Sequence, residues 1–154
     1  MIKRTHVAAL VLSASTLVGI ALNEGYRGEA YVPVPGDVAT IGFGKTRDVH
    51  PGDKTTPGRA LVDLLADVNS HSEGIKRCIK VPLYPGEFSA YSSLAYNIGV
   101  GAFCSSTLVK RLNTEDYPGA CSQILVWDKF KGKPLRGLTI RRQQEYRTCI
   151  GAAA

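Results

Sequence analysis

The sequence lacks the features of several protein classes. Its four cysteines, Cys78, Cys104, Cys121 and Cys149, include no Cys-x-x-Cys pair, which argues against a zinc site and a redox motif. The three histidines form no metal-binding set, so we expect no metal and no cofactor. No cluster of basic residues with interleaved aromatic residues is present, so we expect no nucleic-acid partner. Glycine (16) and proline (8) are too few to indicate disorder.

The length and charge are those of one ordinary domain. A chain of 154 residues is long enough to bury a substantial core, and we expect a monomer. The formal net charge is +6, which would attract polyanions such as anionic lipid or an acidic wall polymer. The same charge also serves solubility alone, and the composition does not separate the two interpretations.

The N-terminus resembles an export signal. Lys3 and Arg4 precede an uncharged run of sixteen residues, Val7 to Leu22. A spanning helix needs about 20 apolar residues, and this run is diluted by alanine, serine, threonine and glycine. Such a segment gains little from lipid, so it should insert only marginally.

Three interpretations of this segment compete. It is a signal peptide cleaved after the small residues Gly19 and Ala21, a permanent anchor, or a segment that enters the membrane and later leaves it intact. The weak hydrophobicity disfavours the permanent anchor. Basic residues before the run predict a cytoplasmic N-terminus and a periplasmic remainder. In an exported protein, an even number of cysteines indicates two disulfides.

The remaining sequence predicts a β-hairpin followed by helices. Strands are expected over Ala30–Val34 and Ala39–Phe43, around the turn Pro35-Gly36-Asp37. Thr56-Pro57 should cap a long helix that runs to about Ile79. Further helices are expected over residues 87–97, from Ser105 or Ser106 to 112, over 118–127, and over 140–149 after a Thr139 cap. We therefore predict an α+β fold in which a long helix joins a small β-hairpin lobe to a helical lobe.

Several segments, taken in order, resemble one known family. They are Glu24-Gly25-Tyr26-Arg27, Thr40-Ile41-Gly42-Phe43-Gly44, residues 92–99, residues 101–108, Trp127, and Gly137-Leu138 with Arg141, Arg142 and Glu145. Each is weak alone, but their order is similar to that of the phage lysozymes, glycoside hydrolase family 24. The resemblance implies a lysozyme-like fold and cleavage of the glycan strands of peptidoglycan.

The resemblance also implies roles for two residues. Glycoside cleavage needs a group that protonates the leaving oxygen, and Glu24 is expected to be that acid, beside apolar Leu22 and Tyr26 that would keep it protonated. Alone, Glu24 would be an ordinary helix-end glutamate. Thr40 matches the family threonine that places the attacking water. Without the motif it would be a β-branched strand residue.

The chain departs from the family at the second carboxylate. The aspartate expected nine residues after Glu24 is replaced by Pro33, and the distance from Glu24 to Thr40 is one residue longer than usual. Asp37 is the nearest candidate, although it is equally well explained as a turn aspartate after glycine. Glu29 is a weaker substitute. With neither, Glu24 and Thr40 would act with a bound water, and inversion is favoured over retention.

Other family positions have more modest interpretations. Asn97 either binds sugar N-acetyl groups or caps a helix, and Trp127 either stacks on sugar or lies in the core. Of Arg141 and Arg142, we expect one in an ion pair and one in solvent. For the disulfides we expect Cys104–Cys121, between successive helices, and Cys78–Cys149, from the long helix to the last one.

Together these observations predict an endolysin. Residues 1–22 would form a signal-arrest-release segment, an apolar signal-anchor helix that tethers the enzyme to the inner membrane. Residues 23–154 would form the lysozyme domain, a muramidase active in the host periplasm after release. The segment Val7 to Leu22 would then complete the helix before Glu24. The alternatives are a lytic transglycosylase, which needs no water-placing partner, and a non-catalytic membrane-tethered wall-binding module.

Overall fold

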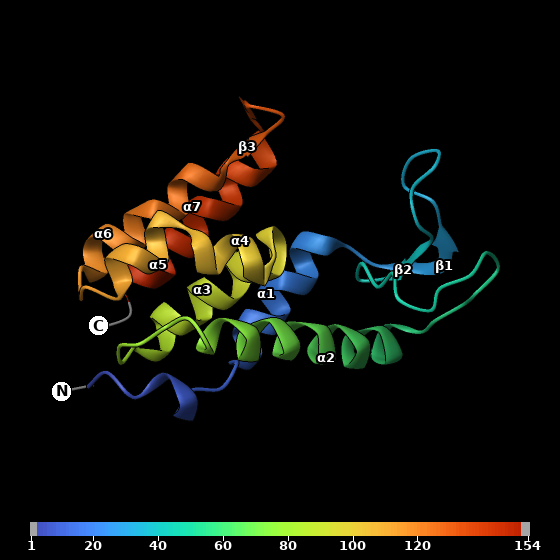
Figure 1. The fold of residues 1–154 in the computed structure, drawn as a ribbon. Coiled ribbons are helices and arrows are strands. Elements are labelled where there is room, and N and C mark those ends of the chain that lie inside the picture. Colours follow the sequence, from blue (N-terminus) through green and yellow to red (C-terminus); the bar gives the residue numbers. More distant parts are fainter. Residues whose placement is uncertain (1–2, 152–154) are drawn as a thin grey trace. The chain divides into compact units, whose positions relative to one another are not determined.

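The computed structural model describes residues 3–151, which fall into two compact units. Residues 17–69 form one unit, here called the hairpin unit. Residues 3–16 and 70–151 form the other, here called the helical unit. Figure 1 shows the helices and small sheets of both. The α+β class predicted from the sequence is confirmed.

The hairpin unit contains a two-stranded antiparallel sheet. Strand β1 (Arg27–Tyr31) pairs with β2 (Thr40–Gly42), with Arg27 opposite Gly42, Tyr31 opposite Thr40, and an irregular register between them. The second strand lies where the sequence predicts it. The first strand begins three residues earlier than predicted and ends at Tyr31, because Pro33 has no N–H to give to a ladder.

The long helix α2 (Pro57–Lys76) matches its prediction closely. Thr56 Oγ1 accepts a hydrogen bond from the amide of Arg59 (3.3 Å), which is the contact of an N-cap residue with the third helical position. Pro57 occupies the first helical position, where its missing N–H costs nothing. The chain leaves the helix before Cys78, three residues before the predicted end.

The N-terminal run does not form the single apolar helix that the sequence predicts. It is divided into a 3-10 turn, η1 (Val7–Ala9), and the helix α1 (Ala14–Glu24). Ser13 separates them because its Oγ accepts from the amide of Thr16 (3.2 Å) and so starts a new helix. Among residues 3–151, no helix is both long and apolar enough to cross a membrane.

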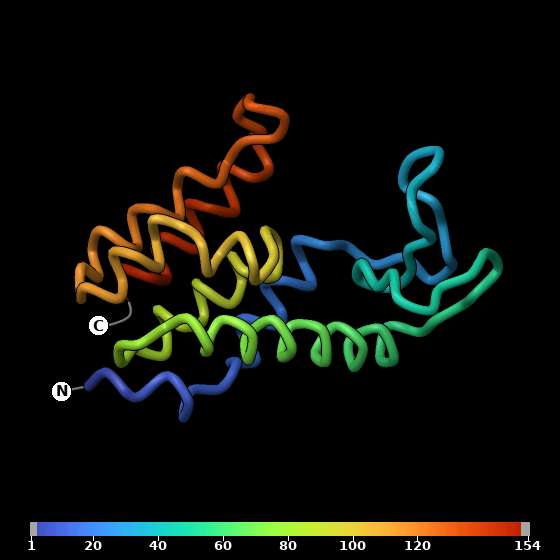
Figure 2. The backbone as a smooth tube through the Cα atoms, viewed as in Figure 1, coloured from blue at the N-terminus to red at the C-terminus, as the bar shows by residue number. Residues whose placement is uncertain are grey.

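The helical unit is built around α3 (Pro85–Ile98). Residues 87–95 of this helix are all buried. It packs mainly against α7 (Arg136–Ile150), and it also contacts α4 (Val100–Ser105). The segments between α4 and α7 are α5 (Thr107–Leu112), α6 (Tyr117–Ser122), the 3-10 turn η2 (Gln123–Trp127), and strands β3 (Lys129–Phe130) and β4 (Lys133–Pro134). Figure 2 shows how this chain folds back on itself between the yellow and red segments.

The ends of these helices partly differ from prediction. Ser106, one of two predicted caps, accepts from the amide of Val109 and starts α5. The last helix begins at Arg136, not after Thr139, whose hydroxyl instead donates within the helix to Leu135 O and also contacts Asp128. The β3–β4 hairpin was not predicted, since two exposed residues per strand leave no alternating apolar pattern.

Two disulfides are present as expected, but the predicted pairing is wrong. The bridges are Cys78–Cys104 and Cys121–Cys149, each with Cα atoms 5.7 Å apart. The reason lies in the packing. Helix α6 lies against α7, which brings Cys121 to Cys149. The segment after α2 is instead held by Asn113, whose side-chain amide donates to Cys78 O (2.8 Å) and whose oxygen accepts from the amide of Lys80 (2.8 Å).

This pairing is directly testable. Trypsin cuts after Lys80, after Lys110 and Arg111, and after the basic residues between Cys121 and Cys149, so each cysteine falls in a separate peptide. We expect non-reducing peptide mapping to find Cys78 linked to Cys104 and Cys121 linked to Cys149. Replacing either pair by serine should lower the free energy of unfolding by about 2–4 kcal/mol, because each bridge closes a long loop of the unfolded chain. A peptide that links Cys104 to Cys121 would contradict the fold described here.

Candidate active site

Glu24 is the last residue of α1. The helix ends there because the chain turns at Gly25, whose amide donates to Ala21 O (3.0 Å). Glu24 is an exposed residue, and Leu22 is 80% exposed, so Leu22 does not give the apolar shelter that the sequence predicts. Tyr26 is directed elsewhere, since its hydroxyl donates to Thr55 O (2.9 Å) and its ring contacts Phe43.

Thr40 begins β2 and is buried, with 8% of its surface exposed. Its hydroxyl donates to Val38 O (3.3 Å), which fixes the side chain and leaves the oxygen lone pairs to accept another hydrogen bond. Glu24 precedes β1 by a few residues and Thr40 lies opposite Tyr31 at the end of β1. Both predicted residues therefore belong to the same small unit.

Asp37 lies in the loop that joins the two strands. Its amide donates to Val34 O (3.0 Å), and Gly36, at φ 88°, follows Pro35, which together make a type II turn. One carboxylate oxygen, Oδ1, accepts from the amide of Val38 (2.8 Å). This is the geometry of a turn aspartate, and it is compatible with a second role only for the remaining oxygen.

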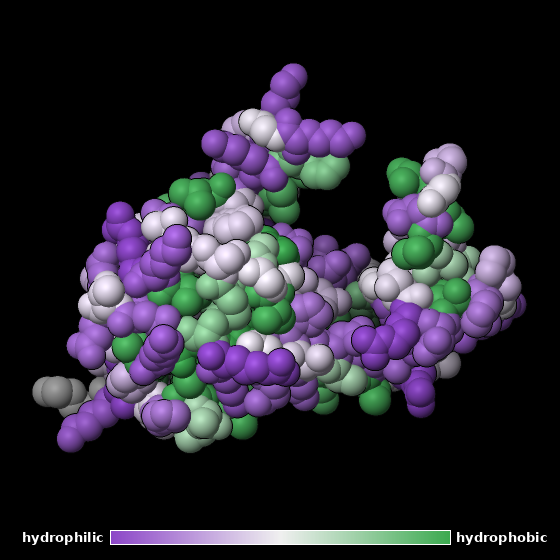
Figure 3. Space-filling view, in the orientation of Figure 1, coloured by the Kyte–Doolittle hydropathy of each residue, from purple (hydrophilic) through white to green (hydrophobic). Residues whose placement is uncertain are grey.

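The other carboxylate alternatives are less favourable. Pro33, at the family's aspartate position, is exposed in the same loop. Glu29 forms an exposed ion pair with Lys54 (3.0 Å). Figure 3 shows hydrophobic residues on the upright loop of the hairpin, where Val34 and Val38 are more than half exposed. In this part of the described structure, Glu24 and Asp37 lie beyond opposite ends of the paired strands.

The residues behind β2 explain the glycine-flanked motif. Ile41 and Lys45 exchange two backbone hydrogen bonds, which closes the turn after the strand. Gly42 has φ 67°, and a Cβ built on it would lie 2.9 Å from the Cβ of Ala60 in α2. The motif therefore lets β2 approach α2 closely.

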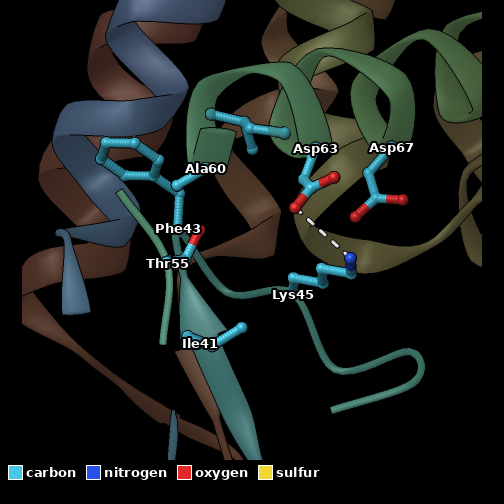
Figure 4. Close-up of a pocket in the computed structure, with 9 residues that line it drawn as sticks. Ile41, Phe43, Lys45, Thr55, Ala60, Asp63 and Asp67 are labelled. Carbon is cyan, nitrogen blue, oxygen red and sulfur yellow. Dashed lines mark hydrogen bonds and ion pairs between the residues drawn. The ribbon is translucent and has the colours of Figure 1, made fainter. Parts of the chain in front are cut away.

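A small pocket lies at this contact (Figure 4). Lys45 Nζ lies 3.3 Å from Asp63 Oδ2, and Arg59 Nε lies 3.6 Å from the other oxygen of Asp63. Asp67 also lines the pocket. Sequence reasoning missed this charged group, because Lys45 and Asp63 are eighteen residues apart and belong to no recognisable motif. Its position indicates that it supports the strand that carries Thr40.

In the helical unit, the predicted polar residues form a buried network around Glu145. The carboxylate oxygen Oε1 accepts from Ser93 Oγ (2.6 Å), Arg141 Nε (3.3 Å) and Arg142 Nη2 (3.0 Å). The other oxygen lies 2.7 Å from Arg142 Nε, close enough for an ion pair although the N–H is not aligned as a hydrogen bond. Burial lowers the pKa of Arg142, and the attraction of Glu145 opposes that effect.

The contacts of this network correct the prediction for the two arginines, and they show which residue Asn97 contacts. Both arginines are buried and paired with Glu145, so neither is the solvated residue that the sequence predicts. Asn97 Oδ1 accepts from Arg142 Nη1 (3.0 Å), which links the end of α3 to α7. Trp127 is partly buried against the core. Among residues 3–151, no three His, Cys, Asp or Glu side chains are placed to hold a metal ion.

The family model described as phage lysozyme matches residues 21–145. The chain belongs to the phage lysozyme family. It is 41% identical to an endolysin of Acyrthosiphon pisum secondary endosymbiont phage 1, over 87% of this chain and 94% of that protein. It is 32% identical to the SAR-endolysin of Enterobacteria phage P21, over 92% of this chain and 88% of that protein.

Solved structures agree with this assignment. The endolysin of Escherichia coli O157:H7 phage FAHEc1 superimposes with a TM-score of 0.81 at 33% sequence identity, covering 96% of each chain. The lysozyme-like fold expected from the motifs is therefore confirmed. The match to the family begins near the end of α1, so it includes Glu24, Thr40 and the buried network around Glu145.

The close approach at Gly42 gives a stability prediction. Gly42→Ala should lower the free energy of unfolding by more than about 2 kcal/mol, because the new methyl group meets Ala60 in addition to the strain of a positive φ. Gly36→Ala is the matched control, since Gly36 also has a positive φ but a Cβ added there would meet nothing within 4 Å. That variant should lose only about 1 kcal/mol. Equal losses in urea denaturation would refute the close approach.

Proposed function

We propose that this chain is an endolysin, a muramidase that hydrolyses the β-1,4 bond between N-acetylmuramic acid and N-acetylglucosamine in peptidoglycan and so lyses the host cell. The main support is the phage lysozyme match over residues 21–145, which includes the acid at the end of α1. Relatives that are named endolysins cover most of the chain. The enzyme is a glycoside hydrolase and needs no cofactor in this proposal.

Glu24 is proposed as the general acid. It donates its proton to the glycosidic oxygen as the bond to the anomeric carbon breaks, and the leaving sugar departs as an alcohol. Glu24 is exposed, so a glycan can reach it from solvent. The charge that develops on the sugar ring is relieved when water adds to the anomeric carbon.

Thr40 is proposed to place that water. Its hydroxyl already donates to Val38 O, so its oxygen can accept from a water that attacks the face opposite Glu24. The water loses a proton to a base or to solvent, and the product has inverted configuration. Asp37 is the proposed base only through its Oδ2 atom, since Oδ1 is occupied by the amide of Val38. Asn97 is exposed, and it is proposed to bind a sugar N-acetyl group through its side-chain amide nitrogen, since its oxygen accepts from Arg142.

Three carboxylate variants test this assignment. We expect Glu24→Gln to lose at least about 100-fold in murein hydrolysis, because proton donation is removed. Asp37→Asn keeps an oxygen that accepts from the amide of Val38 and removes only the charge. An amide cannot take a proton from water, so a loss of tenfold or more in murein hydrolysis would make Asp37 the base. Glu29→Gln is the control, an exposed ion-paired carboxylate of the same unit, and should be unchanged.

The products decide between the candidate reactions. Purified murein is digested and the fragments are identified by mass spectrometry. Reducing muramic ends that disappear in Glu24→Gln support the hydrolase. Anhydro ends would support the lytic transglycosylase, which needs the acid but no placed water. If folded wild-type protein binds murein and yields no fragments, it is a wall-binding module.

The N-terminal segment is proposed to tether the enzyme before it acts. Residues 1–22 would insert in the inner membrane with Lys3 and Arg4 in the cytoplasm, and residues 23–154 would wait in the periplasm as a monomer. Relatives named SAR-endolysins support this proposal. So does the extent of α1, because Ala14 to Leu22 belong both to the apolar run and to the helix that ends at Glu24. The same residues would therefore be needed both for insertion in the membrane and for the helix α1 of the folded protein, and they cannot serve both at once.

A charge placed in this segment should release the enzyme early. Val18 is 55% exposed in the folded chain, so Val18→Lys should leave the folded state intact while it costs about 2.5–3.5 kcal/mol in the membrane. Val62→Lys is the control, because Val62 is 60% exposed on α2, outside the apolar run. Fractionation of energised cells should find Val18→Lys soluble and Val62→Lys in the membrane. Equal retention of both would count against tethering, and mass spectrometry of the released protein shows whether residues 1–22 remain.

A further inference from the structure

The first described residues are not a loose tail. Thr5 pairs with Leu83 in an antiparallel bridge, in which the amide of Thr5 donates to Leu83 O (2.8 Å) and the amide of Leu83 donates to Thr5 O (2.9 Å). Val7 and Leu10 follow and are buried in the core of the helical unit, at 4% and 7% exposed. Residues 4–10 are therefore part of the packed structure.

The side chain of Arg4 occupies a defined site beside this bridge. Its guanidinium makes two hydrogen bonds to Glu87, from Nη2 to Oε1 (2.8 Å) and from Nε to Oε2 (3.2 Å). The guanidinium carbon lies 3.5 Å from the ring centroid of Tyr117 and 4.3 Å from that of Tyr84. Two aromatic rings and a carboxylate are the groups that recognise a planar cation.

The residues that contact Arg4 are themselves held in place by hydrogen bonds. Glu87 is 2% exposed in α3, and its Oε2 also accepts from the amide of Tyr84 (2.8 Å). The hydroxyl of Tyr117 donates to Pro82 O (3.1 Å), which fixes that ring. A pocket lined by Arg4, these three residues and the Cys121–Cys149 bridge continues the site.

The buried carboxylate explains why a cation belongs here. A buried charge is costly unless it is paired, and Arg4 makes the only ion pair to Glu87 found among the described residues. Arg4 keeps 29% of its side chain exposed, so it reaches Glu87 from the surface of the helical unit. The hydrogen bond to Glu87 raises the pKa of Arg4.

We propose that Glu87, Tyr84 and Tyr117 form a guanidinium-binding site whose ligand is Arg4, and that this contact holds the N-terminal segment on the helical unit. The inference rests on the proposed function in one respect. If Arg4 is cytoplasmic while the segment is inserted, the site is empty in the tethered enzyme and fills only on release. Arg4 then serves first as a basic residue that orients the segment in the membrane. Later it makes the contact with Glu87, Tyr84 and Tyr117 that holds the segment on the helical unit, here called the latch.

Hydrogen exchange on the purified, soluble full-length protein tests the latch. The matched variants are Arg4→Lys, which keeps the charge but loses the planar two-point contact, and Lys3→Ala, which removes a neighbouring exposed charge. We expect Arg4→Lys to speed exchange of the Thr5 and Leu83 amides by roughly tenfold, because the stacked, paired contact is lost. Lys3→Ala should not change these amides, and amides of α7 should be unchanged in both variants.

A second variant separates the site from a general loss of structure. Tyr117→Leu removes one ring, and we expect it to speed exchange at Thr5 as Arg4→Lys does. The double variant should be no faster than either single one, since both changes break the same contact. Protection of Thr5 that is unchanged in Arg4→Lys, or effects that simply add, would overturn the proposal.

This measurement is independent of lysis and of membrane release. A protein that shows the latch by exchange but is never retained in energised membranes would contradict the proposed tethering alone. A protein that is tethered and released normally but shows no change at Thr5 would contradict the latch alone.

Discussion

The N-terminal apolar run is the constraint on which the rest of the structure depends. Val7 and Leu10 complete the core of the helical unit, and Ile20 and Ala21 are buried farther along the same run. Residues that could enter a membrane are therefore required by the folded protein. Under the proposed tethering, this segment must be apolar enough to pack, yet weak enough to leave lipid, and its many small residues suit both demands.

The carboxylates of this protein include buried ones and exposed ones, with different roles. Glu87 and Glu145 are buried in α3 and α7, and each is held by arginine and by further hydrogen bonds. These carboxylates are structural, because removing a partner would leave an uncompensated buried charge. Glu24 and Asp37, the carboxylates proposed to act on the glycan, lie instead at exposed positions of the hairpin unit. The family motifs include both the buried Glu145 and the exposed Glu24, so a match to a motif does not show whether a charged residue is buried. For this reason the sequence pattern could not show that Arg142 is buried.

Local signals predicted the helices well and the connections poorly. Thr56 and Pro57 started α2, and Ser106 started α5, since a cap satisfies amides within one turn of the chain. The same rule made Ser13 a helix start that divided the N-terminal run, although the overall apolar pattern predicted one helix. The pairing of cysteines failed because it depends on which helices pack together. The contacts of α6 with α7, and of Asn113 with the end of α2, are not encoded in spacing.

The sequence by itself determined the family, the class of fold, the position of Glu24 at the end of a helix and the presence of two disulfides. These follow from ordered motifs, from periodicity and from composition, all of which are local or additive. Only the tertiary structure decided the disulfide partners, the burial of both arginines around Glu145, the turn hydrogen bond of Asp37 and the site that binds Arg4. Each of these brings together groups whose interaction depends on packing and burial. Arg4 and Glu87, 83 residues apart, meet only because the folded chain places them side by side.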